Sequence, residues 1–162
     1  MDQEIERKFL LDGRPSIIAG HPSTRITQGY LAITDDTEVR VRSRDHDRLL
    51  TVKRGRGGVR GEVTIPLTRE QFDDMWALTA GRRLTKRRWE VPHEGVTLEI
   101  DVFDGDLAGL VIAEVEFPSL ERSIAFTPPD WFGREVTDDP AYRNAALATT
   151  GVAIGAEGAA DR

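Results

Sequence analysis

The stretch Glu4-Ile5-Glu6-Arg7-Lys8-Phe9-Leu10 has a charged side chain at every second position near the start of the chain. In a β-strand, side chains two positions apart point to the same face and lie about 6.6 Å from each other. Glu4, Glu6 and Lys8 would therefore bring two carboxylates and one ammonium to one face. A single strand of this kind is usually solvent-facing, but the same spacing recurs along most of the later strands.

The later segments repeat this alternation of charged residues with Val, Leu or Ile. In residues 38–44, Val39 and Val41 share one face while Arg40 and Arg42 share the other. Short turns separate most of these segments, which is typical of an antiparallel sheet. The predicted strands cover residues 3–11, 25–33, 38–44, 49–54, 62–67, 84–91, 96–103 and 110–118.

Three helices are predicted between and after these strands. The first begins at Thr68, whose spacing to Gln71 is that of a capping box, and ends at Gly81. Its apolar positions form one stripe that would cover the outside of the sheet. A second, short helix begins near Ser119, and a third covers about residues 140–149.

The composition indicates one globular domain. The 162 residues are enough for one core, and 39% hydrophobic with 31% charged residues argue against a disordered chain. The formal net charge of -6 argues against a nucleic-acid binder. There is no cysteine, no apolar run long enough to span a membrane and no apolar signal region, so we expect a cytoplasmic protein. We assign residues 1–150 to the domain and expect 151–162 to be a disordered tail.

The charged face of the predicted sheet differs from an ordinary solvent-facing one. It contains few Ser, Thr, Gln or Asn residues, and its charges are sorted by strand. Acids occupy the first, seventh and eighth strands: Glu4, Glu6, Glu99, Asp101, Glu114 and Glu116. Bases occupy the third, fourth and sixth strands, with Lys8 ending the first: Arg40, Arg42, Lys53, Lys86 and Arg88.

If the sheet closes on itself, these carboxylates converge on one wall and the basic residues oppose them. Crowded carboxylates repel each other unless a cation neutralises them. Oxygen-rich clusters without His or Cys suit Mg²⁺ or Mn²⁺. The opposing Arg and Lys side chains would hold an anion with several negative charges. The pattern therefore predicts a metal-dependent polyphosphate site.

The order of these motifs resembles the CYTH superfamily, the triphosphate tunnel metalloenzymes. The matching positions are Glu4-x-Glu6-x-Lys8, Arg40-x-Arg42, Thr51-x-Lys53, Glu62, Lys86-x-Arg88, Glu99-x-Asp101 and Glu114-x-Glu116. The resemblance spans about residues 3–149. It implies an α+β fold: an eight-stranded antiparallel closed β-barrel, or tunnel, with helices packed on the outside.

The resemblance also assigns roles to single residues. The acids that would hold metal are Glu4, Glu6, Asp101, Glu114 and Glu116. The residues that would bind substrate are Lys8, Arg40, Arg42, Lys53, Lys86, Arg88, Glu62 and Tyr30. The five metal acids and Lys8 are the expected catalytic residues, and two Mg²⁺ or Mn²⁺ ions are the expected cofactor. The role of Glu62 stays open, Glu99 is equally well explained by a salt bridge, and Tyr30 by packing.

The implied function is hydrolysis of a terminal phosphoryl group of inorganic tripolyphosphate, by in-line attack of water in a two-metal site. The chain is similar to the short bacterial inorganic tripolyphosphatases. The alternatives are a nucleoside or thiamine triphosphatase, a class IV-type adenylate cyclase, or a non-catalytic polyphosphate-binding module. The expected partner is the small-molecule triphosphate. The oligomeric state stays open, a homodimer included, and so does whether the last helix plugs one tunnel mouth.

Overall fold

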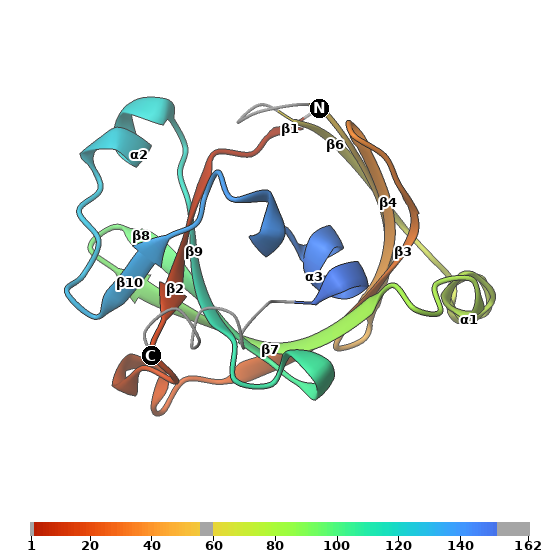
Figure 1. Cartoon of the computed structure of the whole chain (residues 1–162), viewed down its shortest axis with the longest axis horizontal. Helices are drawn as coiled ribbons and strands as arrows, with labels where there is room; N and C mark the ends of the chain where they lie inside the picture. Colours follow the sequence, from red (N-terminus) through yellow and green to blue (C-terminus); the bar gives the residue numbers. More distant parts are fainter. Residues whose placement is uncertain (1, 56–59, 152–162) are drawn as a thin grey trace.

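One antiparallel sheet of ten strands dominates the computed structural model, which describes residues 2–55 and 60–151 (Figure 1). The strands are β1 (Asp2–Gln3), β2 (Glu6–Leu11), β3 (Ser23–Ile33), β4 (Thr37–Arg44), β5 (Asp47–Arg54), β6 (Gly61–Pro66), β7 (Arg83–His93), β8 (Val96–Phe103), β9 (Val111–Glu116) and β10 (Phe132–Glu135). The count exceeds the predicted eight because the N-terminal segment forms two strands and β10 adds another. The predicted tail lies outside the described residues, except for Gly151.

The sheet curls into a tunnel, and the N-terminal segment connects its two sides. The hydrogen-bonded order is β1-β6-β5-β4-β3-β7-β8-β9-β2-β10. Only Glu4 and Ile5 separate β1, which pairs with β6, from β2, which pairs with β9. The predicted closed barrel is therefore a curled antiparallel sheet whose strand order has two ends, and the chain itself bridges them at Glu4 and Ile5.

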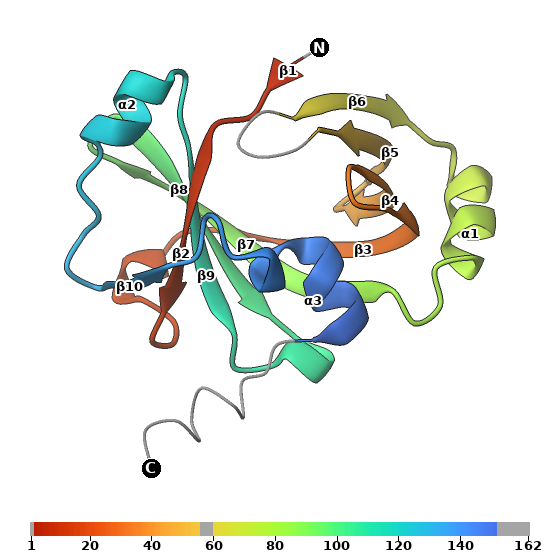
Figure 2. The ribbon, with the colours of Figure 1, turned by 45° about the horizontal axis from the view of Figure 1, so that its top comes forward.

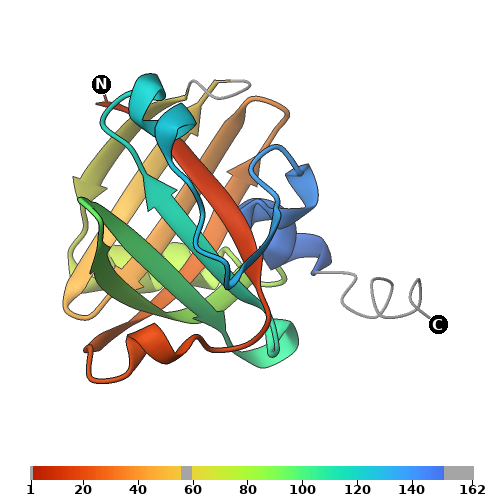
Figure 3. The same ribbon diagram turned by 90° about the vertical axis from the view of Figure 1, so that its left-hand side faces the viewer.

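Two α-helices lie outside the sheet, as predicted. These are α1 (Arg69–Ala77) and α2 (Leu120–Ala125) (Figures 2 and 3). Thr68 begins α1 with the predicted capping box, in which its hydroxyl accepts from the backbone N–H of Gln71. The 3₁₀ helices are η1 (Ser16–Ile18), η2 (Gly105–Leu107) and η3 (Pro140–Tyr142). Among the described residues, no helix is long and apolar enough to cross a membrane.

The last helix, α3 (Asn144–Thr150), lies inside one end of the curled sheet rather than outside it (Figure 1). This corrects the expectation that all helices pack on the outside. The helix predicted over residues 140–149 is also divided into η3 and α3, because Arg143 between them has an extended backbone with φ -67° and ψ 140°. The buried residues of α3 pack in an apolar cluster with side chains of the concave face: Tyr30, Leu84, Phe103 and Ile112.

The strand register puts charged side chains on the concave face and apolar side chains on the convex face. Lys8 lies opposite Glu114, and Arg88 lies opposite Asp101. The intervening residues form the main core on the convex side of β7, β8 and β9. It includes Trp89, Val91, Leu98, Ile100, Val102, Ala113 and Val115. The inward charged face predicted from the alternation is therefore confirmed.

Candidate active site

The tunnel keeps a cavity of about 280 Å³ beside η3 and α3. Its lining comes from the strands and from the C-terminal segment: Glu4, Glu6, Lys8, Tyr30, Glu38, Arg40, Lys53, Arg60, Thr137, Asp138, Arg143 and Asn144. Six of these residues belong to the predicted site: Glu4, Glu6, Lys8, Tyr30, Arg40 and Lys53. The cavity is therefore the centre of the candidate active site.

Glu4 lies at the break between β1 and β2, beside a base and a second acid. Lys53 Nζ lies 2.9 Å from Glu4 Oε2 and 3.7 Å from Glu62 Oε2. Burial would raise the pKa of Glu4, but a hydrogen bond with Glu62 and the charge of Lys53 lower it overall. Burial and the same hydrogen bond raise the pKa of Glu62. The pair therefore favours a charged Glu4, with Glu62 holding Lys53 in place.

Glu6 shows that carboxylates crowd at this end of the tunnel. Its side chain lines the cavity, where protein atoms surround the carboxylate although part of the residue is exposed to solvent. The charge of Glu114, burial, and the charge of Glu4 together raise the pKa of Glu6 to about 7. The charge of Glu114 is the largest cause of this rise, so a cation bound near Glu6 would lower its pKa again.

Two arginines of β4 have buried Nε atoms without an acceptor. The Nε atoms of Arg40 and Arg42 make no hydrogen bond within the described part of the chain. Burial and repulsion by Arg40, Arg88 and Arg44 lower the pKa of Arg42 to about 10. Buried donors of this kind are nearly always paired in proteins. An anion from outside the chain is the partner that this arrangement lacks.

Tyr30 combines the two roles that were left open for it. It is fully buried, lies opposite Arg40 in the register, and packs in the apolar cluster around α3. Tyr30 also lines the cavity, and its hydroxyl accepts a hydrogen bond from Gln28 Nε2 at 3.1 Å. Tyr30 therefore joins the polar lining to the apolar packing of α3.

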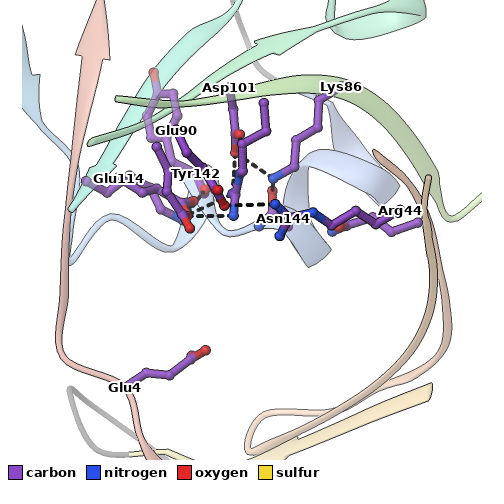
Figure 4. A network of polar contacts seen from close by, with 12 residues as sticks. Glu4, Arg44, Lys86, Glu90, Asp101, Glu114, Tyr142 and Asn144 are labelled. Atoms are coloured by element: carbon purple, nitrogen blue, oxygen red, sulfur yellow. Dashed lines mark hydrogen bonds and ion pairs between the residues drawn. The ribbon is translucent and has the colours of Figure 1, made fainter. Parts of the chain in front are cut away.

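The other predicted bases and acids form a buried ionic wall in β2, β7, β8 and β9 (Figure 4). Arg88 donates to both carboxylate oxygens of Asp101 at 2.7 Å and to Glu114 Oε2 at 3.1 Å. Lys86 Nζ lies 2.7 Å from Asp101 Oδ2, and Lys8 Nζ lies 3.5 Å from Glu114 Oε1. The charges of this wall are thus paired within the protein, whereas the Nε atoms of Arg40 and Arg42 have no acceptor in the described part of the chain.

The five predicted metal acids do not gather at one point. Asp101 is fully buried and Lys86 and Arg88 occupy its oxygens. Glu116 and Glu99 line a separate depression at the β7–β8 turn, and Glu99 Oε2 pairs with Arg88 Nη1 at 2.5 Å, as its salt-bridge alternative predicted. In the described part of the chain, no three acidic or histidine side chains are close enough to hold a metal ion.

The carboxylates at the cavity nevertheless fit a magnesium ion. Mg²⁺ usually binds one or two protein carboxylates and completes its coordination with water and substrate phosphates. Glu4 and Glu6 supply two carboxylates at the cavity, and Glu114 is near enough to raise the pKa of Glu6. The donors are all oxygen atoms, which suits a hard cation.

Two lining arginines were not identified from the sequence. Arg60 Nη2 lies 3.3 Å from Glu38 Oε1, while its buried Nε has no hydrogen-bond partner among the described residues. Arg143 reaches the cavity only because η3 and α3 enter the tunnel. Neither arginine follows the alternation of a strand, so the signal that identified the other site residues is absent for both.

Comparison with known proteins shows that the similarity to the CYTH family covers most of the chain and not only the charged motifs. The CYTH domain family matches residues 2–136. A protein named inorganic triphosphatase from Nitrosomonas europaea is 42% identical over 148 residues, covering 90% of this chain and 96% of that protein. Another of the same name, from Acetivibrio thermocellus, is 38% identical over 152 residues, covering 91% and 94%. A crystal structure of an inorganic triphosphatase matches with a TM-score of 0.70 and 40% identity, over 91% of this chain and 95% of that one.

Proposed function

The chain belongs to the CYTH domain family, and on this basis we propose that it is a triphosphatase that hydrolyses inorganic triphosphate in its tunnel. Relatives named for that activity cover nearly the whole chain. The structural observation that carries the proposal is a contrast. The buried Nε donors of Arg40 and Arg42 lack an acceptor among the described residues, whereas the carboxylates of Glu4 and Glu6 are crowded. A triphosphate with a divalent cation supplies what each group lacks.

Substrate binding belongs mainly to the cations beside the open cavity. Arg40 lines the cavity, and Arg42 follows it on the same face of β4. Both arginines offer planar donor pairs that match phosphate oxygens, whereas Lys8 and Lys53 act as compact charges. Lys53 is held at the cavity by Glu4 and Glu62. In this proposal, Glu62 positions a substrate-binding lysine rather than binding phosphate itself.

The buried wall has a positioning role in the proposed mechanism. Asp101 neutralises Lys86 and Arg88, and Arg88 in turn orients Glu114. We therefore assign these two bases to the scaffold of the site, with Glu114 as the member of the wall whose charge reaches Glu6. Both carboxylate oxygens of Asp101 accept hydrogen bonds from Lys86 and Arg88, so Asp101 stabilises the wall as their counter-ion.

Glu4 and Glu6 are the residues that would hold Mg²⁺ or Mn²⁺, with Glu114 beside them; the family resemblance implies two ions. When bound, the metal neutralises charge on phosphoryl oxygens and polarises them. Glu116 lies opposite Glu6 in the strand register and also borders the other depression, so it would act beside Glu6 at the edge of this site.

In the proposed reaction the protein forms no covalent bond to the substrate; it contributes by positioning the substrate and stabilising its charge. Water attacks a terminal phosphorus, the bond to the bridging oxygen breaks, and the products are orthophosphate and pyrophosphate. Negative charge then grows on the pyrophosphate oxygens. The Nε donors of Arg40 and Arg42 are buried and have no acceptor among the residues described, so they can stabilise that charge without first breaking another hydrogen bond.

A substrate panel tests this function. Orthophosphate release is measured with tripolyphosphate, pyrophosphate, ATP and thiamine triphosphate, each with Mg²⁺, Mn²⁺ or chelator. We expect fast metal-dependent release from tripolyphosphate and slow release from ATP. Faster cleavage of ATP or thiamine triphosphate would favour an organic triphosphatase, and cyclic AMP formation a cyclase. Tight tripolyphosphate binding without turnover under any metal would favour a binding module.

A further inference from the structure

Arg143 lies at the edge of the cavity, and its guanidinium forms no hydrogen bond or ion pair with the described residues. Arg143 lines the cavity and also an adjoining surface depression that it shares with Glu38. Its side chain is exposed, and no hydrogen bond or ion pair joins its guanidinium to the described part of the chain. Because it borders both spaces, Arg143 lies at the rim, where a ligand in the cavity would meet solvent.

Contacts immediately before and after Arg143 fix its backbone at this rim. Lys8 Nζ donates to the carbonyl oxygen of Tyr142 at 3.3 Å, and Lys86 Nζ donates to Asn144 Oδ1 at 3.4 Å. Figure 4 shows Tyr142 and Asn144 close to the ionic wall. The position of Arg143 is therefore set by the same lysines that belong to the site.

Packing of the following helix closes the tunnel behind this rim. Tyr142 and Leu147 are almost fully buried and pack in one cluster with Leu84 and Phe103 of the concave face. A chain of phosphates bound along Arg40 cannot extend into this apolar end. Arg143 borders the cavity immediately before this apolar end, so one end of such a ligand lies within reach of its guanidinium.

Inorganic and organic triphosphates differ at that end. Both ends of tripolyphosphate are terminal phosphoryl groups with two ionisable oxygens. In a nucleoside triphosphate, one end is esterified to a sugar and carries a single negative charge. A guanidinium group gains most from a phosphoryl group that offers two charged oxygens to its two N–H donors.

We propose that Arg143 is a specificity-determining residue that binds the distal terminal phosphoryl group of inorganic triphosphate and favours it over triphosphates esterified at that end. This rests on the proposed function, in which the opposite end of the substrate is hydrolysed near Glu4 and Glu6. It adds a residue outside the strand motifs and gives the inserted C-terminal segment a part in substrate choice.

The test compares binding of two ligands by titration calorimetry in the presence of chelator, with weak ligands measured by competition. Arg143→Ala should weaken tripolyphosphate binding about fivefold, the effect of one exposed charge contact, and ATP binding by less than about twofold. Arg143→Lys should weaken tripolyphosphate binding less than the alanine variant does. Arg25→Ala is the matched control, since Arg25 is an exposed arginine of β3 on the outer face, and it should change neither ligand.

Steady-state kinetics give a second readout. With tripolyphosphate, Arg143→Ala should raise KM by a similar factor and leave kcat nearly unchanged, because Arg143 does not contact the reacting end. If Arg143→Ala weakened the binding of both ligands equally, or did not weaken tripolyphosphate binding, the proposed role of Arg143 would be wrong. Turnover of tripolyphosphate by the wild-type protein would still support the proposed function. A wild-type protein that neither binds nor cleaves tripolyphosphate would overturn the proposed function, and the role of Arg143 with it.

Discussion

At the scale of single residues, two groups of buried charges differ in whether the protein neutralises them. Asp101 pairs with both Lys86 and Arg88 in the wall. Arg42 instead faces other arginines, and its pKa is lowered to about 10. A charge paired inside the protein stabilises the fold, whereas an unpaired one destabilises it until a ligand arrives.

Substitution of Asp101 by Asn tests the paired group. It leaves Lys86 and Arg88 buried without their main counter-charge, so Asp101→Asn should lower the unfolding free energy by about 3–5 kcal/mol. Asp106→Asn, at an exposed position of η2, is the control and should change it by less than about 0.5 kcal/mol. Urea unfolding measures both. Equal stability of the two variants would show that the wall contributes little.

The unpaired group should behave in the opposite way. Arg42→Ala should lower kcat/KM for tripolyphosphate about 10- to 100-fold, the range for one charged hydrogen-bonding group. Because Arg42 is repelled in the free protein, its loss should change the unfolding free energy by no more than about 1 kcal/mol. Arg48→Ala on β5, a residue whose guanidinium donates to the His46 carbonyl oxygen and which does not line the cavity, should keep full activity. A large stability loss without a kinetic effect would contradict the assignment of Arg42 to the substrate.

At the scale of elements, local patterns predicted most strands and the start of α1. Residues 96–103 form β8 as predicted, and Thr68 caps α1. These features depend on alternation and capping, which a few neighbouring residues specify. The entry of α3 into the tunnel could not be predicted in this way. Its alanine-rich sequence shows an apolar face but not which surface covers that face.

The packing of α3 inside the tunnel can be tested by comparing two separate Leu→Ala variants. Leu147 on α3 is 3% exposed, whereas Leu120 on α2 is 63% exposed. Leu147→Ala should lower the unfolding free energy by about 2–5 kcal/mol, the cost of removing a buried Leu side chain. Leu120→Ala should change it by less than about 0.5 kcal/mol. Similar small effects in urea unfolding would mean that α3 is not packed inside the tunnel in solution.

At the scale of the whole molecule, contacts between distant parts of the chain hold the C-terminal segment on the sheet. Arg7 on β2 donates to both carboxylate oxygens of Glu135 on β10, at 2.8 and 3.0 Å. It also donates to the carbonyl oxygens of Ser123 and Phe126. One arginine thus ties β2 to the end of α2 and to β10, two segments that are more than a hundred residues from it.

The ion pair between Arg7 and Glu135 should make the free energy of unfolding depend on pH. The hydrogen bond from Arg7 lowers the pKa of Glu135 in the folded protein. The stabilisation is therefore present above the unfolded-state pKa of about 4.3 and is lost as the pH falls through the lower folded-state value. A double-mutant cycle of Arg7→Gln and Glu135→Gln should give a coupling of no more than about 1 kcal/mol at pH 7, because Glu135 is partly exposed. The coupling should decrease steadily as the pH is lowered below about 4.3; a coupling that stays unchanged down to acid unfolding would contradict it.

The sequence predicted only part of the site, because strand alternation shows which face a residue is on but not which distant side chains it contacts. Glu4, Arg40 and Lys53 were identified because strand alternation puts them on one face, and all three line the cavity. Asp101 shares that face, but its engagement by Lys86 and Arg88 depends on side-chain packing across strands. Arg143 belongs to no strand and reaches the cavity through the path of the whole C-terminal segment.

The most direct test of the account is a crystal structure of the protein with tripolyphosphate. We predict that the triphosphate lies in the tunnel cavity, accepts hydrogen bonds from Arg40 and Arg42, and has one end near Glu4 and Glu6. A triphosphate bound on the outer surface, with Arg40 and Arg42 still lacking an acceptor, would contradict the central claim that the inward charges form the substrate site.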